Sequence, residues 1–286
     1  MEEKRNMLSL LTNRRMFLTS MAVLTSLRSH KKVQAAVDSE EGIKLGVASY
    51  SLRKFSRKEA IRMIKVLETP YVNIKSFHLN YESTPSELAG GVREFEQASL
   101  RIVGGGTITL QKDEDEDVRK HFEYARRCDM PIMVIAPTPE TLPRIEAFVK
   151  QFDIRVAIHN HGPEDPYFPT PQSALKLIKN MDPRMGLCID VGHTARTGVD
   201  VVDSIAEAGD RVLDMHMKDL RSFTDKGSQC AVGEGLMPVA SIFQTLKKMK
   251  YKGHVNLEYE IYPEDPLPGM KQSFAYMRGV LAGMSQ

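Results

Sequence analysis

The sequence has no tryptophan, only three cysteines and no long apolar run. Cys128, Cys188 and Cys230 are too few and too far apart for a disulfide framework or a cysteine-type zinc site. No apolar run approaches the roughly 20 residues that a helix needs to cross a bilayer. We therefore expect neither a disulfide-stapled domain nor a membrane span.

An excess of basic charge is also missing from most of the chain. The formal net charge is +2, but residues 1–36 hold seven of the 39 Lys and Arg and only two of the 37 Asp and Glu. The remainder therefore has 32 basic and 35 acidic side chains, a net charge of −3. Such a balance gives no electrostatic hold on nucleic acid or anionic lipid, and we expect no nucleic-acid partner.

The signatures of covalent hydrolases and phosphate loops are absent. No Gly-x-Ser-x-Gly elbow occurs, and no Cys stands at a predicted helix start beside a His. The triplet Gly104-Gly105-Gly106 lacks the Lys and the spacing of a phosphate loop, so we expect a tight turn or a close approach of substrate there. The acidic run Asp113–Asp117 reads as a helix start and a solvated face.

The first 36 residues resemble an export signal. Asn13-Arg14-Arg15-Met16-Phe17-Leu18 is similar to a twin-arginine motif, and a short apolar stretch, Met16–Leu27, follows it. Val33-Gln34-Ala35-Ala36 then offers small residues for cleavage. We expect export to the periplasm through the twin-arginine route, with an amphipathic N-terminal helix or anchor as the alternative.

Residues 43–286 alternate between short apolar runs and amphipathic stretches. The predicted strands are Lys44–Tyr50, Tyr71–Phe77, Arg101–Thr107, Ile132–Ala136, Ile154–Asn160, Met185–Val191, Val212–Met217 and Val255–Tyr259. Strands that are apolar throughout are typical of parallel sheets, which are buried on both faces. Eight strand–helix pairs predict an α/β fold, a single (β/α)₈ TIM barrel. An open, doubly wound sheet is the alternative.

Helix starts support this alternation. Ser56-Arg-Lys-Glu59 and Thr84-Pro85-Ser86-Glu87 both have the pattern of a capping box. In each, the first residue caps the helix and the Glu three positions later reaches back to it. These two signals predict where the first two helices begin.

Four consecutive predicted strands end in side chains that bind metals. His159 ends the fifth strand and Asp190 the sixth, while His216 and Glu258 end the seventh and eighth. The C-terminal strand ends of a barrel meet around one mouth, so we expect these side chains to converge. A lone His or Glu is usually structural or solvated, but the set of four predicts a metal site. Mixed nitrogen and oxygen ligands suit Mn²⁺, Co²⁺, Zn²⁺ or Fe²⁺ better than Ca²⁺.

A second set of polar side chains is predicted beside the metal. His161 and Lys218 each lie two residues beyond a predicted ligand and so share its strand face. His193 is expected in the loop after the sixth strand. Such groups can bind a hydroxyl-rich substrate, and Lys218 or a neutral His can stabilise a developing enolate. The alternative for Lys218 is a salt bridge to Asp190 or Glu258.

Two further carboxylates, Glu260 and Glu234, are weaker candidates for a role in the site. Glu260 either supports the metal ligands from behind or faces solvent. Gly233-Glu234-Gly235 reads as a mobile loop over the mouth, in which Glu234 is a candidate substrate contact.

Taken together, the motifs of the second half resemble the sugar phosphate isomerase/epimerase superfamily, with its xylose isomerase-like barrel. The matching stretches are Ile158-His-Asn-His-Gly162, Gly186-Leu-Cys-Ile-Asp-Val-Gly-His193, His216-Met-Lys-Asp219, Gly233-Glu-Gly235 and Leu257-Glu258. They occur in the family's order. The first half of the chain matches only by its alternation of strands and helices.

The resemblance implies a metal held by a Glu, an Asp, a His and a second Glu, in which the two Glu also form the acid/base pair. Asp190, His216 and Glu258 match the last three positions, whereas His159 stands at the first. An imidazole bound to a metal has lost its basicity, so one carboxylate base, Glu258, or a His remains. That arrangement fits removal of a proton next to a carbonyl followed by loss of a leaving group. Some members of the superfamily do this to 3-keto-glycosides.

Three classes of function follow as hypotheses. The first is a metal-dependent sugar isomerase or epimerase, or a lyase that eliminates from a 3-keto-glycoside; His159 and export favour the lyase slightly. The second is a phosphodiester hydrolase of the endonuclease branch, against which the net charge of −3 and the export signal argue. The third is an inactive sugar-binding protein. The expected partner is a small sugar or keto-glycoside, and pairing into a homo-oligomer stays open.

Overall fold

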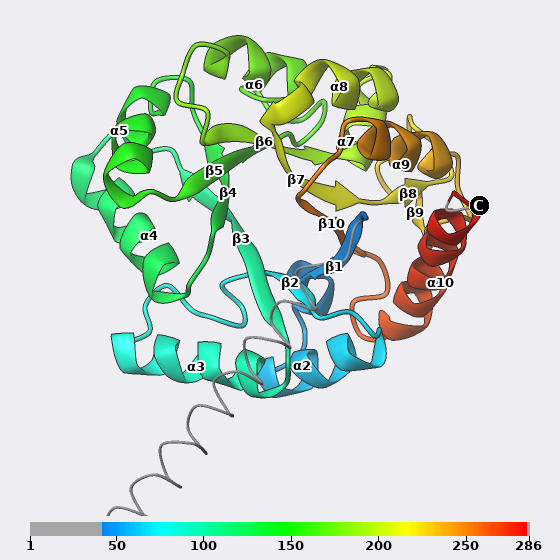
Figure 1. Ribbon diagram of the computed structural model, residues 1–286, viewed down its shortest axis with the longest axis horizontal. Coiled ribbons are helices and arrows are strands. Elements are labelled where there is room, and N and C mark those ends of the chain that lie inside the picture. Colours follow the sequence, from blue (N-terminus) through cyan, green and yellow to red (C-terminus); the bar gives the residue numbers. More distant parts are fainter. Residues whose placement is uncertain (1–41, 285–286) are drawn as a thin grey trace, which may run out of the picture. The chain divides into compact units, whose positions relative to one another are not determined.

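A closed barrel of eight parallel strands lies at the centre of the fold (Figure 1). The structure is a computed structural model that describes residues 42–284, so the expected signal at residues 1–36 lies outside the described residues. The strands are β1 (Lys44–Ala48), β2 (Tyr71–Ile74), β3 (Arg101–Leu110), β4 (Ile132–Pro137), β5 (Arg155–His159), β6 (Met185–Asp190), β7 (Val212–Met217) and β10 (His254–Leu257). Pairing of β1 with β10 closes the ring, which confirms the predicted (β/α)₈ barrel and rules out the open sheet.

Helices surround the barrel on its outside (Figure 1). They are α2 (Arg57–Val66), α3 (Pro85–Gln97), α4 (Asp115–Arg127), α5 (Leu142–Phe152), α6 (Pro171–Ile178), α7 (Val191–Arg196), α8 (Val201–Ala208), α9 (Val239–Lys248) and α10 (Leu267–Gly283). Two 3₁₀ turns, η1 (Ser49–Leu52) and η2 (Gly209–Arg211), and a ribbon of β8 (Asp219–Leu220) with β9 (Gln229–Cys230) complete the described elements. None of the helices between residues 42 and 284 has the length and apolar content of a membrane span.

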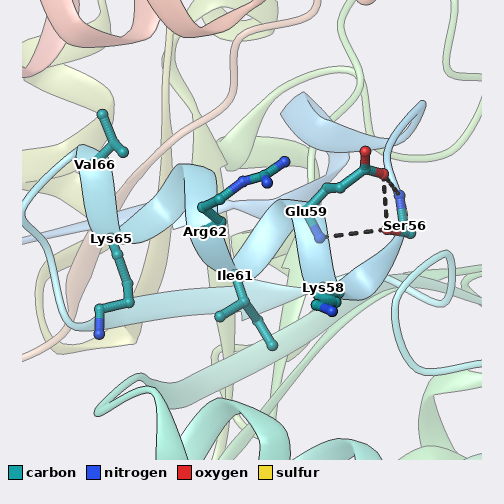
Figure 2. A pocket seen from close by; sticks show the side chains of 7 residues that line it. All are labelled: Ser56, Lys58, Glu59, Ile61, Arg62, Lys65 and Val66. Carbon is teal, nitrogen blue, oxygen red and sulfur yellow. Dashed lines mark hydrogen bonds between the residues drawn. The ribbon is translucent and has the colours of Figure 1, made fainter.

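Both predicted capping boxes are present. Figure 2 shows the first, in which Glu59 of α2 accepts from the backbone N–H and hydroxyl of Ser56, at 3.0 and 2.7 Å. Thr84 and Glu87 make the same contacts at the start of α3. The hollow drawn in Figure 2 lies along α2 and is lined by no predicted site residue. The capping signals therefore located these helix starts correctly.

The chain leaves the first strand earlier than predicted. β1 ends at Ala48 and gives way to η1, because two serine hydroxyls hold the turn against neighbouring strand ends. Ser49 Oγ accepts from the backbone N–H of Lys75 at 2.7 Å, and Ser51 Oγ accepts from that of Tyr259 at 2.8 Å. Strand propensity alone carries no information about such contacts between distant segments.

The glycine triplet is not the predicted tight turn. It lies inside β3, which runs on to Leu110. A Cβ added at Gly104 would lie 3.1 Å from the carbonyl oxygen of Ile132, and one at Gly105 would press on Met130. The glycines are therefore needed because β4 and the segment before it pack closely against β3.

The barrel interior is polar beneath its C-terminal mouth. Asp214 of β7 is fully enclosed and accepts hydrogen bonds from the side-chain amides of Asn73 (2.6 Å) and Asn256 (2.7 Å). Burial raises the pKa of Asp214 to about 6. Asp214 lies two residues before His216 and Asn256 two before Glu258, so this network supports the strand ends that carry the predicted ligands.

At the opposite, N-terminal end of the barrel, His254 is held in its neutral form. Its ring packs on Tyr71 with centroids 4.6 Å apart, and its buried Nε2 has no hydrogen-bond partner within residues 42–284. Burial, aided by Lys44, Arg101 and Arg155, lowers the pKa of His254 to about 4.

We predict that His254→Phe makes the fold less sensitive to acid. A His whose folded pKa lies below its unfolded value of about 6.5 contributes stability above that pH and loses it as the pH falls towards 4. Wild-type protein should lose on the order of 2–3 kcal/mol by this route between pH 6.5 and 4, and the variant less. Urea unfolding at pH 7.5, 5.5 and 4.5 measures this. Parallel losses in both proteins would contradict the prediction.

Candidate metal centre

Four side chains from neighbouring strands converge at the C-terminal mouth of the barrel. His159, Asp190 and His216 end or nearly end β5, β6 and β7, and Glu258 directly follows β10. All four are buried, and one potential ligand atom of each lies within 4.8 Å of the others. Since β5, β6, β7 and β10 are consecutive around the barrel, the strand order itself brings the predicted ligands together.

The donor set fits a divalent cation. His159 Nε2 lies 3.0 Å from His216 Nδ1, and His216 Nδ1 lies 3.1 Å from Glu258 Oε2. The other ring nitrogens, His159 Nδ1 and His216 Nε2, are buried without a hydrogen-bond partner in the described part of the chain. The nitrogens that face the carboxylates are instead His159 Nε2, 3.6 Å from Asp190 Oδ2, and His216 Nδ1, so imidazole nitrogen and carboxylate oxygen meet in one mixed donor set of the kind that divalent zinc, manganese or cobalt accepts. Cys188 also lies against the two imidazoles, but burial raises the pKa of its thiol well above the usual value.

The protonation states of the four side chains also suit metal binding. Burial holds the pKa of His159 well below its usual value, so its imidazole is neutral. Burial opposes ionisation of Asp190 and Glu258, but nearby cationic groups outweigh it and hold both pKa values well below normal. Burial also opposes protonation of His216, yet Glu258 and other carboxylates raise its pKa. A bound cation would take over that balancing of charge.

Lys218 joins the carboxylates of the cluster. Its Nζ lies 3.0 Å from Asp190 Oδ2, 3.0 Å from Glu258 Oε2 and 3.1 Å from Glu260 Oε2. Despite burial, these partners raise the pKa of Lys218 well above its usual value. The salt bridge considered from the sequence is therefore present with both partners, and Glu260 supports Lys218 from the edge of the mouth. Burial raises the pKa of Glu260 itself.

His161 lies beside the cluster and is oriented by an unforeseen partner. Its ring centroid is 4.3 Å from that of His159, and its Nδ1 lies 3.2 Å from a carboxylate oxygen of Asp165. Burial lowers the pKa of His161. A half-buried imidazole backed by a carboxylate has the arrangement of a general acid or base.

His193 does not lie in the predicted loop. It belongs to α7, a short helix that begins directly after β6. Asp190 caps this helix by accepting from the backbone N–H of His193 at 2.8 Å, so one carboxylate both ends the strand and starts the helix. The His193 Nε2 lies 4.0 Å from Asp190 Oδ2, and burial lowers the pKa of this ring to about 4.

The loop with two glycines is fastened rather than loose. Asp219 accepts from the backbone N–H groups of Gly233, Gly235 and Met237 at 2.8, 3.1 and 2.9 Å. A Cβ at Gly235 would collide with the Asp219 carboxylate. This arrangement differs from the mobile loop expected from the sequence.

The structure does not bring Glu234 into the cluster. Its carboxylate instead pairs with Arg221 and Gln272, each at 2.6 Å.

Lys75 is a mouth residue that the sequence analysis did not single out. It follows β2 by one position and lies two residues after Asn73, whose side chain points into the barrel. The same alternation turns Lys75 inward. Its Nζ lies 5.3 Å from the ring centroid of Tyr50, in η1. Strand alternation alone would have indicated that Lys75 points inward. A pattern of metal ligands does not include Lys, however, so that pattern did not identify Lys75.

The chain matches the family described as the xylose isomerase-like TIM barrel over residues 26–280. It is 23% identical over 190 residues to the inosose dehydratase of Lactiplantibacillus plantarum, a match that covers 60% of each chain. The chain spans 40% and 60% of the two curated relatives it matches, about half their length.

Solved structures share the fold at low identity. A D-psicose 3-epimerase determined with D-fructose is 17% identical, with a TM-score of 0.67 over 84% of this chain and 100% of that one. The IolI protein with a bound zinc atom is 14% identical, with a TM-score of 0.71 over 84% of this chain and 99% of that one.

We predict that Asp190→Asn weakens metal binding roughly 100-fold or more, because it removes one anionic ligand. The amide still offers an oxygen to cap α7, so the fold should persist. Zinc titration calorimetry on metal-stripped protein measures the affinity, and mass spectrometry of dialysed protein counts the ions per chain. Glu96→Gln, an exposed change on α3, is the charge-matched control. Equal affinities in the two variants would contradict this assignment.

Proposed function

Because the chain belongs to the xylose isomerase-like TIM barrel family, we propose that it is a divalent-metal-dependent enzyme that removes a proton next to a sugar carbonyl. The observation that carries the proposal is the buried convergence of His159, Asp190, His216 and Glu258 with Lys218. The dehydratase among the relatives and the epimerase among the solved structures support the same class of chemistry.

The four residues of the cluster would hold the metal, which when bound supplies a Lewis acid for the substrate oxygens. Zinc is a suitable candidate, since it accepts imidazole and carboxylate ligands and is bound by the structural neighbour IolI. The chain's own residues then decide where a proton goes.

Glu258 is the proposed base. It is ionised, almost fully buried and directed into the mouth between His216 and Lys218. As it takes the proton, negative charge develops on the substrate oxygens. The ammonium of Lys218 beside it stabilises that charge, and does so strongly because water is excluded.

His161 is the proposed second proton-transfer group. Asp165 orients its ring, and its lowered pKa keeps a neutral imidazole available. Returning a proton to carbon gives isomerisation or epimerisation, whereas delivering it to a leaving oxygen gives elimination. His159 in place of a second carboxylate favours elimination from a 3-keto-glycoside, because the metal ligand on that side is no longer a base.

We predict that the zinc-loaded protein incorporates deuterium next to the carbonyl of its substrate in D₂O. Proton NMR follows a panel of ketohexoses and a 3-keto-glucoside. Interconversion of ketoses identifies an isomerase or epimerase, and release of the aglycone together with a new unsaturated or hydrated sugar identifies a lyase. Glu258→Gln should lower the rate by about 100-fold or more, the contribution of a general base. Glu96→Gln should leave it unchanged.

Full activity of Glu258→Gln would remove Glu258 from the role of base. Absence of both exchange and release, in protein shown to hold zinc, would contradict proton abstraction from these substrates.

We further propose export through the twin-arginine route, on the strength of Arg14 and Arg15 ahead of a short apolar stretch. Substitution of both by Lys should retain the full chain in the cytoplasm of a bacterial host that has this pathway. Fractionation and immunoblotting measure the distribution, and Arg28→Lys is the control. Equal periplasmic amounts in both variants would contradict a twin-arginine signal.

A further inference from the structure

The mouth has a cation on the wall opposite Asp190. Lys75 follows β2, and in the barrel order β2 lies across the ring from β6, which carries Asp190. The side chain of Lys75 is half-buried, with Nζ near the face of Tyr50. A substrate that contacts the metal ligands on one wall would therefore face Lys75 on the other.

This ammonium has no anionic partner of its own. Within residues 42–284 no carboxylate forms an ion pair with Lys75, in contrast to Lys218 with its three. The titratable groups that act on Lys75 electrostatically are Glu258, Cys188, Lys218 and Glu260. Burial lowers the pKa of Lys75, and the more distant carboxylates compensate only in part.

Binding of a metal ion by the four ligands would increase this imbalance of charge around Lys75. Glu258 would be shared with a divalent ion, and Glu260 is already paired with Lys218 at 3.1 Å. The Cys188 thiol is uncharged, because burial raises its pKa. Lys75 would then keep a desolvated positive charge with no negative charge of the protein free to balance it, which is an unfavourable state.

A nearby cation reinforces the same wall. The guanidinium of Arg53 lies 4.5 Å from the Tyr50 ring centroid and donates to the backbone carbonyl of Glu260 at 2.8 Å. The Tyr50 ring thus lies beside the cationic groups of both Lys75 and Arg53. Its centroid is 6.0 Å from that of the exposed Phe77 ring. The wall offers positive charge and aromatic surface together, as a sugar ring with an anionic substituent requires.

We propose that Lys75 binds a carboxylate of the substrate, so that the site takes acidic sugars, of the uronic acid class, in preference to their neutral counterparts. The carboxylate supplies the missing counter-charge, and the hydroxyl and carbonyl oxygens of the same molecule reach the metal ligands. The inference rests on the proposed function only in taking the mouth as a sugar-binding site.

The test compares two sugars that differ in one group. Calorimetric titration of the zinc-loaded full chain with D-glucuronate and with D-glucose at pH 7.5 gives the two dissociation constants. D-Glucuronate should bind about ten-fold more tightly or better, as expected for a charge-assisted contact in a desolvated site. Lys75→Gln should abolish the preference and leave the affinity for D-glucose unchanged.

Two further variants separate the local contact from other effects. Lys65→Gln removes one positive charge from the outer surface of α2, beside the hollow in Figure 2, and should keep the full preference. Lys75→Arg keeps the charge and should keep most of it. The wild-type comparison stands even where a Lys75 variant folds poorly.

Equal affinity of wild-type protein for the two sugars, or binding of neither, would overturn the proposal. A preference that survives in Lys75→Gln would also overturn it, since the carboxylate would then sit on the metal. The deuterium-exchange experiment fails or succeeds independently of this ratio, so a wrong reaction and a wrong substrate class give different results.

Discussion

Two buried carboxylates that must both stay ionised govern the organisation of the mouth. Asp190 and Glu258 are almost fully enclosed, and burial alone would protonate them. His216 beside Glu258, and Lys218 at 3.0 Å from both carboxylates, keep them charged. Because the negative charge is already fixed in the protein, a divalent ion meets ligands that need no deprotonation.

The scaffold holds this arrangement through strand ends and their supports. Asp214 and its two amide partners fill the layer beneath the mouth, and Asn160 supports Asp190 by accepting from its backbone N–H at 3.0 Å. Asp190 in turn caps α7. Asp190 is thus fixed both by its place at a strand end and by further polar contacts, which is how a precise metal geometry is preserved in a loop-rich mouth.

The sequence predicted the barrel and the four converging side chains because both depend on periodic patterns. Apolar runs mark strands, and in a parallel barrel the end of each strand has a known destination. Lys75, Asp165 and α7 were missed for other reasons. Lys75 follows the alternation of its strand but is not a metal ligand, Asp165 lies in an irregular segment four residues after His161, and α7 is too short to show a pattern. The glycine triplet was misread because close packing of strands and a tight turn both select glycine.

The end of β7 and the residues after it position a second segment of the chain as well as side chains of the metal centre. His216, Lys218 and Asp219 follow one another within four residues, and Asp219 fastens the chain from Gly233 to Met237. Transplanting the centre into another barrel would therefore require both segments as one cassette. A graft of His216 and Lys218 without the Gly233–Met237 segment would leave the buried carboxylate of Asp219 without its hydrogen-bond donors. Evolution should likewise keep the two segments together.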